Sequence, residues 1–141
     1  MIWKNDFNLE ILNGLSKNTM VEHLGIEFTK IGENYIIATM PVDNRTVQPM
    51  RLLHGGASVA LAETLGSVAS AMVVDYNKYH VVGIEINANH LKSATSGVVT
   101  GKVEPVKIGG KLHIWNIEIR NESDELLCVS RLTTMVLPNK S

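Results

Sequence analysis

The stretch from Gln48 to Ser67 contains the residues whose types and spacing could do chemistry. It reads QPMRLLHGGASVALAETLGS and brings an amide, a His-Gly-Gly sequence and one carboxylate together in the chain. Glu63 is the only charged residue between Gly55 and Val74. Its apolar neighbours predict that Glu63 is buried, where an ionised carboxylate is costly unless something uses it and where burial would raise its pKa. Glu63 is therefore a candidate base or nucleophile, and the alternative is a structural glutamate that neighbouring strands satisfy by hydrogen bonds.

The His54-Gly55-Gly56 sequence lies where a helix is expected to begin. Free N–H groups and the helix dipole favour negative charge at such an end, and glycine lets a ligand approach the backbone. This combination suits the oxyanion of a carbonyl group under attack, and Gln48 adds an amide donor nearby. His54 is expected to brace the loop rather than to act as a base. The alternative is that the two glycines only shape a tight turn into the helix.

The distance along the helix sets a limit on how these groups can act together. Gly55 precedes Glu63 by eight residues, about 12 Å at about 1.5 Å per residue. A reacting carbonyl carbon must lie about 3 Å from both its attacker and its oxyanion donors. One helix can hardly serve both ends of one site, so we predict a dimer with antiparallel helices and two composite sites. Ser67, one turn beyond Glu63, could hold the carboxylate or a water molecule.

Other candidate residues carry a weaker signal. The Gly-Gly turn between Lys107 and Lys111 could contact a phosphate, although two exposed lysines on a turn are common. His90, beside Lys92 on an apolar strand face, is as readily structural as functional. The histidines show no spacing typical of a metal site, so no metal is expected. The lone Cys128 excludes a disulfide within the chain and is expected to be buried and unactivated.

Composition narrows the class of protein. The 141 residues suit one domain, 1–141, with 45% apolar and 19% charged residues. A formal net charge of -1 gives no indication of nucleic acid or an anionic membrane as a partner. The N-terminus does not resemble a signal peptide, and the carboxylate of Glu63 argues against a membrane span over residues 55–74. A cytoplasmic location is expected.

The elements that must position these residues follow from periodicity. We predict a short helix capped by Asn5 or Asp6 and ending at Leu15, a helical turn over 19–24, a hairpin of strands over 26–31 and 35–42, a long helix over 57–74, and strands over 81–93, 98–106, 113–119 and 126–137. In the 81–93 strand, one face is expected to hold Val82, Ile84, Ile86, Ala88 and His90. A curved antiparallel sheet wrapped around the single long helix would bury it, which is an α+β arrangement.

Six motifs resemble those of the hotdog-fold acyl-CoA thioesterases. They are MPVDNRTVQP at 40–49, LLHGGASV at 52–59, AETLGSVA at 62–69, VVGIEINANH at 81–90, WNIEI at 115–119 and SRLTT at 130–134. The resemblance covers nearly the whole chain and implies a curved antiparallel sheet around one central helix. It implies hydrolysis of an aromatic acyl-CoA, with 1,4-dihydroxy-2-naphthoyl-CoA favoured, and an acylated aryl carrier protein or a broad acyl-CoA range as alternatives.

The resemblance also implies residue roles. Glu63 would be the nucleophile or general base, Gln48 and the Gly55 N–H would polarise the thioester carbonyl, His54 would orient the loop, and Ser67 would assist Glu63. The CoA contacts would fall on Gly83, His90, Leu91, Lys92, Ser93, Lys107, Ile108, Gly109, Gly110 and Lys111. Relatives often have arginine where Lys92 stands, so the bidentate form of that phosphate contact is lost here. The resemblance further implies a homo-oligomer, a dimer or a dimer of dimers, and no cofactor beyond the CoA of the substrate.

Two other classes of function share these sequence features. A dehydratase acting on hydroxyacyl carrier protein also pairs a histidine with a helical carboxylate across subunits, but Gln48 and the His-Gly-Gly spacing favour the thioesterase. A non-catalytic acyl-CoA-binding module would have no need for Glu63 in an apolar helix.

Overall fold

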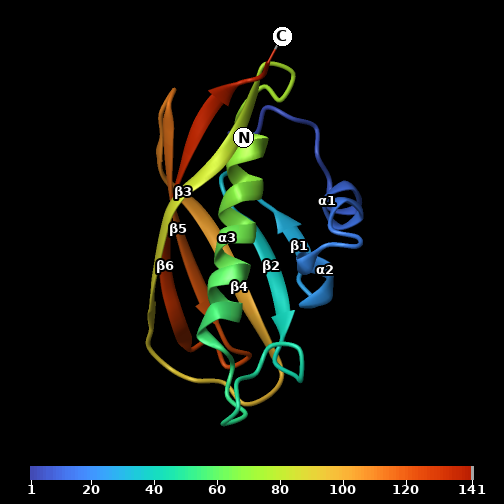
Figure 1. The fold of residues 1–141 in the computed structure, drawn as a ribbon, viewed down its shortest axis with the longest axis vertical. Coiled ribbons are helices and arrows are strands. Elements are labelled where there is room, and N and C mark those ends of the chain that lie inside the picture. Colours follow the sequence, from blue (N-terminus) through green and yellow to red (C-terminus); the bar gives the residue numbers. More distant parts are fainter. Residues whose placement is uncertain (141) are drawn as a thin grey trace.

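Six antiparallel strands curve around one long helix in the computed structural model, which describes residues 1–140 (Figure 1). The elements are α1 (Leu9–Leu15), α2 (Met20–His23), β1 (Glu27–Ile31), β2 (Ile36–Pro41), α3 (Gly55–Met72), β3 (Tyr79–His90), β4 (Val98–Ile108), β5 (Leu112–Arg120) and β6 (Leu126–Pro138). This is the predicted order of elements, and the α+β hotdog arrangement is confirmed.

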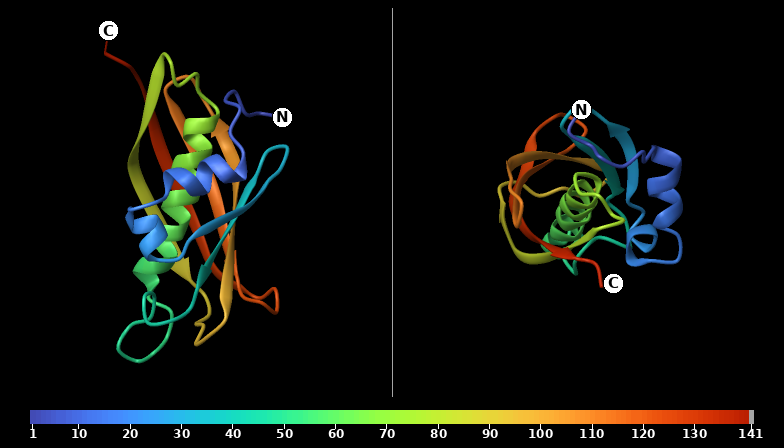
Figure 2. Two further views of the ribbon diagram at one scale, coloured as in Figure 1. Left: turned by 90° about the vertical axis from the view of Figure 1, so that its right-hand side faces the viewer. Right: turned by 90° about the horizontal axis from the view of Figure 1, so that it is seen from above.

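The sheet wraps α3 on its concave face. The strand order is β1-β2-β4-β5-β6-β3, so β1 and β3 form its two edges. The end-on view in Figure 2 shows the strands curving around α3, with α1 and α2 on the side of β1 and β2. The central strand β5 alternates as predicted: His113, Trp115, Ile117 and Ile119 are all buried. Cys128 on β6 is also buried, as expected.

The long helix α3 has two different faces. Leu61, Leu65 and Met72 are fully buried against the sheet. The opposite stripe carries Glu63, which is exposed, and Ser67, which is half-buried. Part of α3 is thus left uncovered by the strands of its own chain. Within residues 1–140, neither α3 nor any other helix has the length and apolarity of a membrane span.

The N-terminal helix begins later than predicted. Asn8, not Asn5 or Asp6, caps α1, and its side chain accepts a hydrogen bond from the N–H of Ile11 at 2.9 Å. The side chain of Asn5 instead donates to the carbonyls of Ala71 and Val74, at 2.8 Å each. The last carbonyls of a helix have no partner within it, so Asn5 satisfies the end of α3 and ties the N-terminal segment to it.

A bulge in β3 overturns the predicted face of that strand. Gly83 pairs with Thr134 and Glu85 with Thr133, which leaves Ile84 as the extra residue. Thr134 hydrogen-bonds to α3, so its partner Gly83 lies on the helix side, whereas Val82 pairs with Met135 on the opposite face. Val82 and Ile84 are 40% and 50% exposed. The prediction was right for Ile86, Ala88 and His90, whose partners on β6 are buried. It was wrong for Val82 and Ile84, because a bulge shifts the alternation by one residue.

Candidate active site

The first turn of α3 presents one free N–H group. His54 is the N-cap, and its Nδ1 accepts a hydrogen bond from the N–H of Gly56 at 2.7 Å. The N–H groups of Ala57 and Ser58 bond to the carbonyl of His54. The N–H of Gly55 has no hydrogen-bond partner within residues 1–140. The side chain of His54 therefore caps the first turn of α3, and Gly55 is left to donate to a ligand.

Gln48 is held so that its amide nitrogen is also available. Its backbone N–H donates to the carbonyl of Leu52, and its own carbonyl accepts from the N–H of Arg51, both at 2.8 Å. Its side-chain Oε1 accepts from the N–H of Met50. The Nε2 group has no acceptor in the described part of the chain. A fixed amide with a free donor is suited to binding a carbonyl oxygen.

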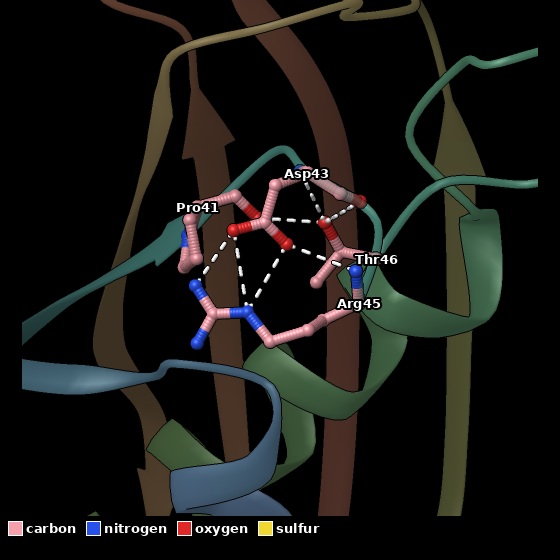
Figure 3. A network of polar contacts seen from close by, with 4 residues as sticks. All are labelled: Pro41, Asp43, Arg45 and Thr46. Carbon is pink, nitrogen blue, oxygen red and sulfur yellow. Dashed lines mark hydrogen bonds and ion pairs between the residues drawn. The ribbon is translucent and has the colours of Figure 1, made fainter.

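A polar brace fixes the loop that carries Gln48 (Figure 3). Arg45 binds the carboxylate of Asp43 through Nε at 3.1 Å and a terminal nitrogen at 2.6 Å, and this pairing holds the pKa of Asp43 below its ordinary value. Thr46 is buried, and its hydroxyl donates to the carbonyl of Pro41 at 2.7 Å and accepts from the N–H of Asp43 at 3.1 Å. The carbonyl of Thr46 accepts from the N–H of His54 at 2.8 Å, so this brace also locates the start of α3.

One cleft joins this end of α3 to the end of β3. It has a volume of about 380 Å³, and its lining includes Gln48, Gly55, His90, Leu91, Lys92 and Ser93. The imidazole of His90 lies directly on Gly55: a Cβ atom added to this glycine would fall 2.9 Å from His90 Nε2. The structure therefore brings together the predicted carbonyl donors, Gln48 and Gly55, and four of the predicted CoA contacts, residues 90–93.

Lys92 has a partner that the sequence did not indicate. Its Nζ pairs with the carboxylate of Glu125, whose pKa this contact lowers. Both side chains are about half exposed, so the pair is accessible to a ligand. An anion bound at Lys92 would compete with Glu125, which reduces the net positive charge expected there.

Glu63 is exposed rather than buried in the single chain, which corrects the expectation drawn from its apolar surroundings in sequence. The reason is its place on the stripe of α3 that the sheet leaves uncovered. Its Oε1 lies 3.8 Å from the position that a Cβ atom on Gly83 would take, so the carboxylate sits over the bulge of β3. The hydroxyl of Ser67, one turn on, has no hydrogen-bond partner within the described residues.

The predicted groups do not converge within one chain. Gly55 begins α3, and Glu63 lies two turns further along the same unbroken helix. Three other predicted CoA contacts are more distant still. Ile108, Gly109 and Gly110 line a cleft of about 610 Å³ with Val73 and Val74, beyond the far end of α3. A single chain therefore presents parts of a site at both ends of α3.

A buried polar cluster fastens the far half of α3 to the sheet. The hydroxyl of Ser70 accepts from Trp115 Nε1 at 2.6 Å, and lies 2.6 Å from the hydroxyl of Thr134 and 3.0 Å from His113 Nδ1. Burial lowers the pKa of His113. The sequence reading overlooked this cluster, although a serine among the apolar residues of α3, facing strands that carry histidine, tryptophan and threonine, was a usable signal.

The edge strand β3 is unpaired on its outer side. It is twelve residues long, and Tyr79, Val82 and Ile84 are among its exposed side chains. Within residues 1–140 only β6 pairs with it. A long edge with exposed apolar side chains is a template for pairing with another strand. A second copy of the chain would satisfy it.

The chain resembles known proteins over almost its whole length. Residues 50–128 match the Thioesterase superfamily. The chain is 50% identical to the 1,4-dihydroxy-2-naphthoyl-CoA hydrolase of Escherichia coli over 97% of this chain and 100% of that one. It is 49% identical to the proofreading thioesterase EntH of Cronobacter turicensis over 97% and 99%. The crystal structure of a thioesterase from Haemophilus influenzae superimposes with a TM-score of 0.95 at 51% identity, covering 98% of this chain and 96% of that one.

Proposed function

The chain belongs to the thioesterase superfamily and is a thioester hydrolase, and we propose that its substrate is an aromatic acyl-CoA, 1,4-dihydroxy-2-naphthoyl-CoA before others. The reaction adds water across the thioester bond and gives 1,4-dihydroxy-2-naphthoate and CoA. No metal or organic cofactor takes part. The naphthoyl substrate is proposed because the Escherichia coli relative of that name matches over its full length.

We propose that the carbonyl oxygen binds between the Gly55 N–H and Gln48 Nε2. Neither donor has a partner within residues 1–140, both line the same cleft, and both are fixed before the substrate arrives. Donors fixed in advance stabilise the negative charge that develops on oxygen during attack. His90 and Lys92 line the same cleft and suit the CoA portion.

Glu63 of a second copy would either attack the thioester carbonyl carbon itself or activate a water molecule that attacks it. As a nucleophile, its carboxylate would add to the carbonyl carbon and expel CoA as thiolate, and water would hydrolyse the resulting anhydride. As a general base, it would take a proton from water, which would add directly. Ser67, one turn beyond Glu63 on α3, would orient either the carboxylate or the water. Two copies paired through β3 would give two equivalent sites, and the dimer could pair further into a tetramer.

The observation that carries this proposal is that α3 begins at a cleft with two donors that have no partner within residues 1–140 and, two turns further on, carries a carboxylate beside an apolar pocket. The test is a panel of aryl-CoA and fatty acyl-CoA thioesters, with release of free thiol followed over time. We expect the highest kcat/KM with the naphthoyl thioester, and a loss of at least about 10²-fold in Glu63→Gln. Unchanged hydrolysis by Glu63→Gln would refute the role of the carboxylate.

A second candidate is proofreading of an aryl carrier protein, because the chain is about as similar to the relative of that kind. A carrier protein presents its thioester on a protein surface instead of on a nucleotide. An acylated aryl carrier protein should therefore be included in the panel. If its kcat/KM exceeds that of every CoA thioester, this second candidate replaces the first.

A further inference from the structure

A second, apolar pocket lies between α2 and α3, next to Glu63. It has a volume of about 330 Å³. One wall is Met20, Val21 and Leu24, and the other includes Val59, Ala60 and Glu63. Among the described residues that line it, Glu63 is the only charged one. Its size lies at the small end of the range for small-molecule sites, about 300–1,000 Å³.

We propose that this pocket receives the acyl group of the thioester and that α2 sets the size of acyl group accepted. The proposal rests on the proposed hydrolysis. The carbonyl carbon must come within about 3 Å of Glu63 or its water. The acyl group is bonded to that carbon, so it must enter a space that borders Glu63. The α2–α3 pocket borders it, whereas Glu63 is not part of the lining of the Gln48–Lys92 cleft.

The side chains that line the cleft beside Gly55 and the α2–α3 pocket suit different parts of the substrate. The cleft beside Gly55 contains an amide, an imidazole and an ammonium group, which suit the polar pantetheine and phosphate portions of CoA. The α2–α3 pocket offers almost only hydrocarbon, which suits an aromatic ring. In the composite site, the acyl pocket comes from the subunit that supplies Glu63, and the CoA cleft comes from its partner.

The residues of α2 can adapt this pocket without disturbing the core. Leu24 is 9% exposed and anchors the short helix, whereas Met20 is 63% exposed at the rim. Methionine is flexible and polarizable, so it can close over rings of different shape. Val21 is partly buried and forms the wall between them. Changes at Met20 and Val21 are therefore expected to alter acyl preference more than stability.

Two variants that fill the pocket from opposite walls test this proposal. Val21→Phe and Ala60→Leu should each lower kcat/KM for 2-naphthoyl-CoA by about 10- to 100-fold, because even one methylene of mismatch in a pocket can give discrimination of this size. Butanoyl-CoA, which needs little of the volume, should lose less than about 3-fold. Leu15→Phe, on exposed α1 and outside the pocket lining, should change neither. Equal losses for both thioesters, or no loss for either, would overturn the proposal.

Measurements of ligand affinity test the acyl pocket separately from the proposed hydrolysis. In a Glu63→Gln background, titration calorimetry should show that Ala60→Leu raises the Kd of 2-naphthoyl-CoA and leaves the Kd of CoA unchanged. If neither Kd changes, the acyl group lies elsewhere. If the wild-type protein releases no thiol from the naphthoyl thioester while the Kd values shift as expected, the proposed naphthoyl hydrolysis fails and the acyl pocket stands.

Discussion

Mixing two inactive variants should restore activity if each site is composite. Gln48→Ala removes a carbonyl donor, and Glu63→Ala removes the carboxylate. Loss of one such donor lowers kcat by about 10²- to 10³-fold, and loss of a general base costs about 10²- to 10⁴-fold. Each variant alone is therefore expected to retain about 1% of wild-type activity or less.

The expected recovery follows from counting subunits. When the two variants are unfolded together in equal amounts and refolded, about half of the dimers contain one of each. In such a heterodimer, one site combines the intact Gln48 of one chain with the intact Glu63 of the other, and the second site lacks both. About one quarter of all sites are then complete, which exceeds the activity of either variant by about 25-fold.

The structural reason is that α3 keeps Gly55 and Glu63 apart. Its eighteen residues form one unbroken helix, so Gly55 and Glu63 stay about 12 Å apart along its axis. Thiol release by the refolded mixture measures the recovery, and a mixture of Glu63→Ala with Glu63→Gln is the matched control, because no complete site can form in it. If the first mixture is no more active than the second, each site is contained in one chain and the composite site is wrong.

Three further changes test how the site is held. Gly55→Ala should lower kcat by about 10²-fold, because the new Cβ would lie 2.9 Å from His90 Nε2 and must displace the ring or the donor. The control is Gly14→Ala, whose new Cβ meets nothing within 4 Å and which should leave kcat unchanged. Thr46→Val, which loses the hydroxyl contacts of Figure 3, should lower kcat/KM by about 10-fold, with recovery in Thr46→Ser. Burial lowers the pKa of His113 from its ordinary value of 6.5, so the unfolded state binds more protons than the folded state just below that pH. The free energy of unfolding, measured with urea, should therefore be greatest above about pH 6.5 and fall as the pH drops below it, and His113→Phe should flatten this fall.

The long elements could be predicted because their patterns repeat over many residues. The strand with His113, Trp115, Ile117 and Ile119 shows strict alternation, and all four are buried. The long helix was placed to within two residues at each end. The cap of α1 was misplaced because Asn5, Asp6 and Asn8 all have capping side chains, and only the contact of Asn5 with the end of α3 distinguishes them.

The candidate site was predictable in its residue types but not in its surroundings. The bulge at Ile84 could not be seen, because Val81, Val82 and Ile84 are apolar on both sides of Gly83 and either alternation fits. It becomes visible only from the register against β6. Likewise, Lys92 and Glu125 are 33 residues apart, and no local pattern links them.

The error over the burial of Glu63 supports the composite site. The carboxylate is exposed in one chain, and it lies over Gly83 on the edge strand β3, which is unpaired there. A two-fold axis beside this edge would pair β3 with its copy in antiparallel fashion and bring the partner chain against the open stripe of α3. The same contact would satisfy the edge, cover Val82 and Ile84, and enclose Glu63. Helix rise and sheet topology are independent properties of the chain, and both favour the proposed site that two copies would share.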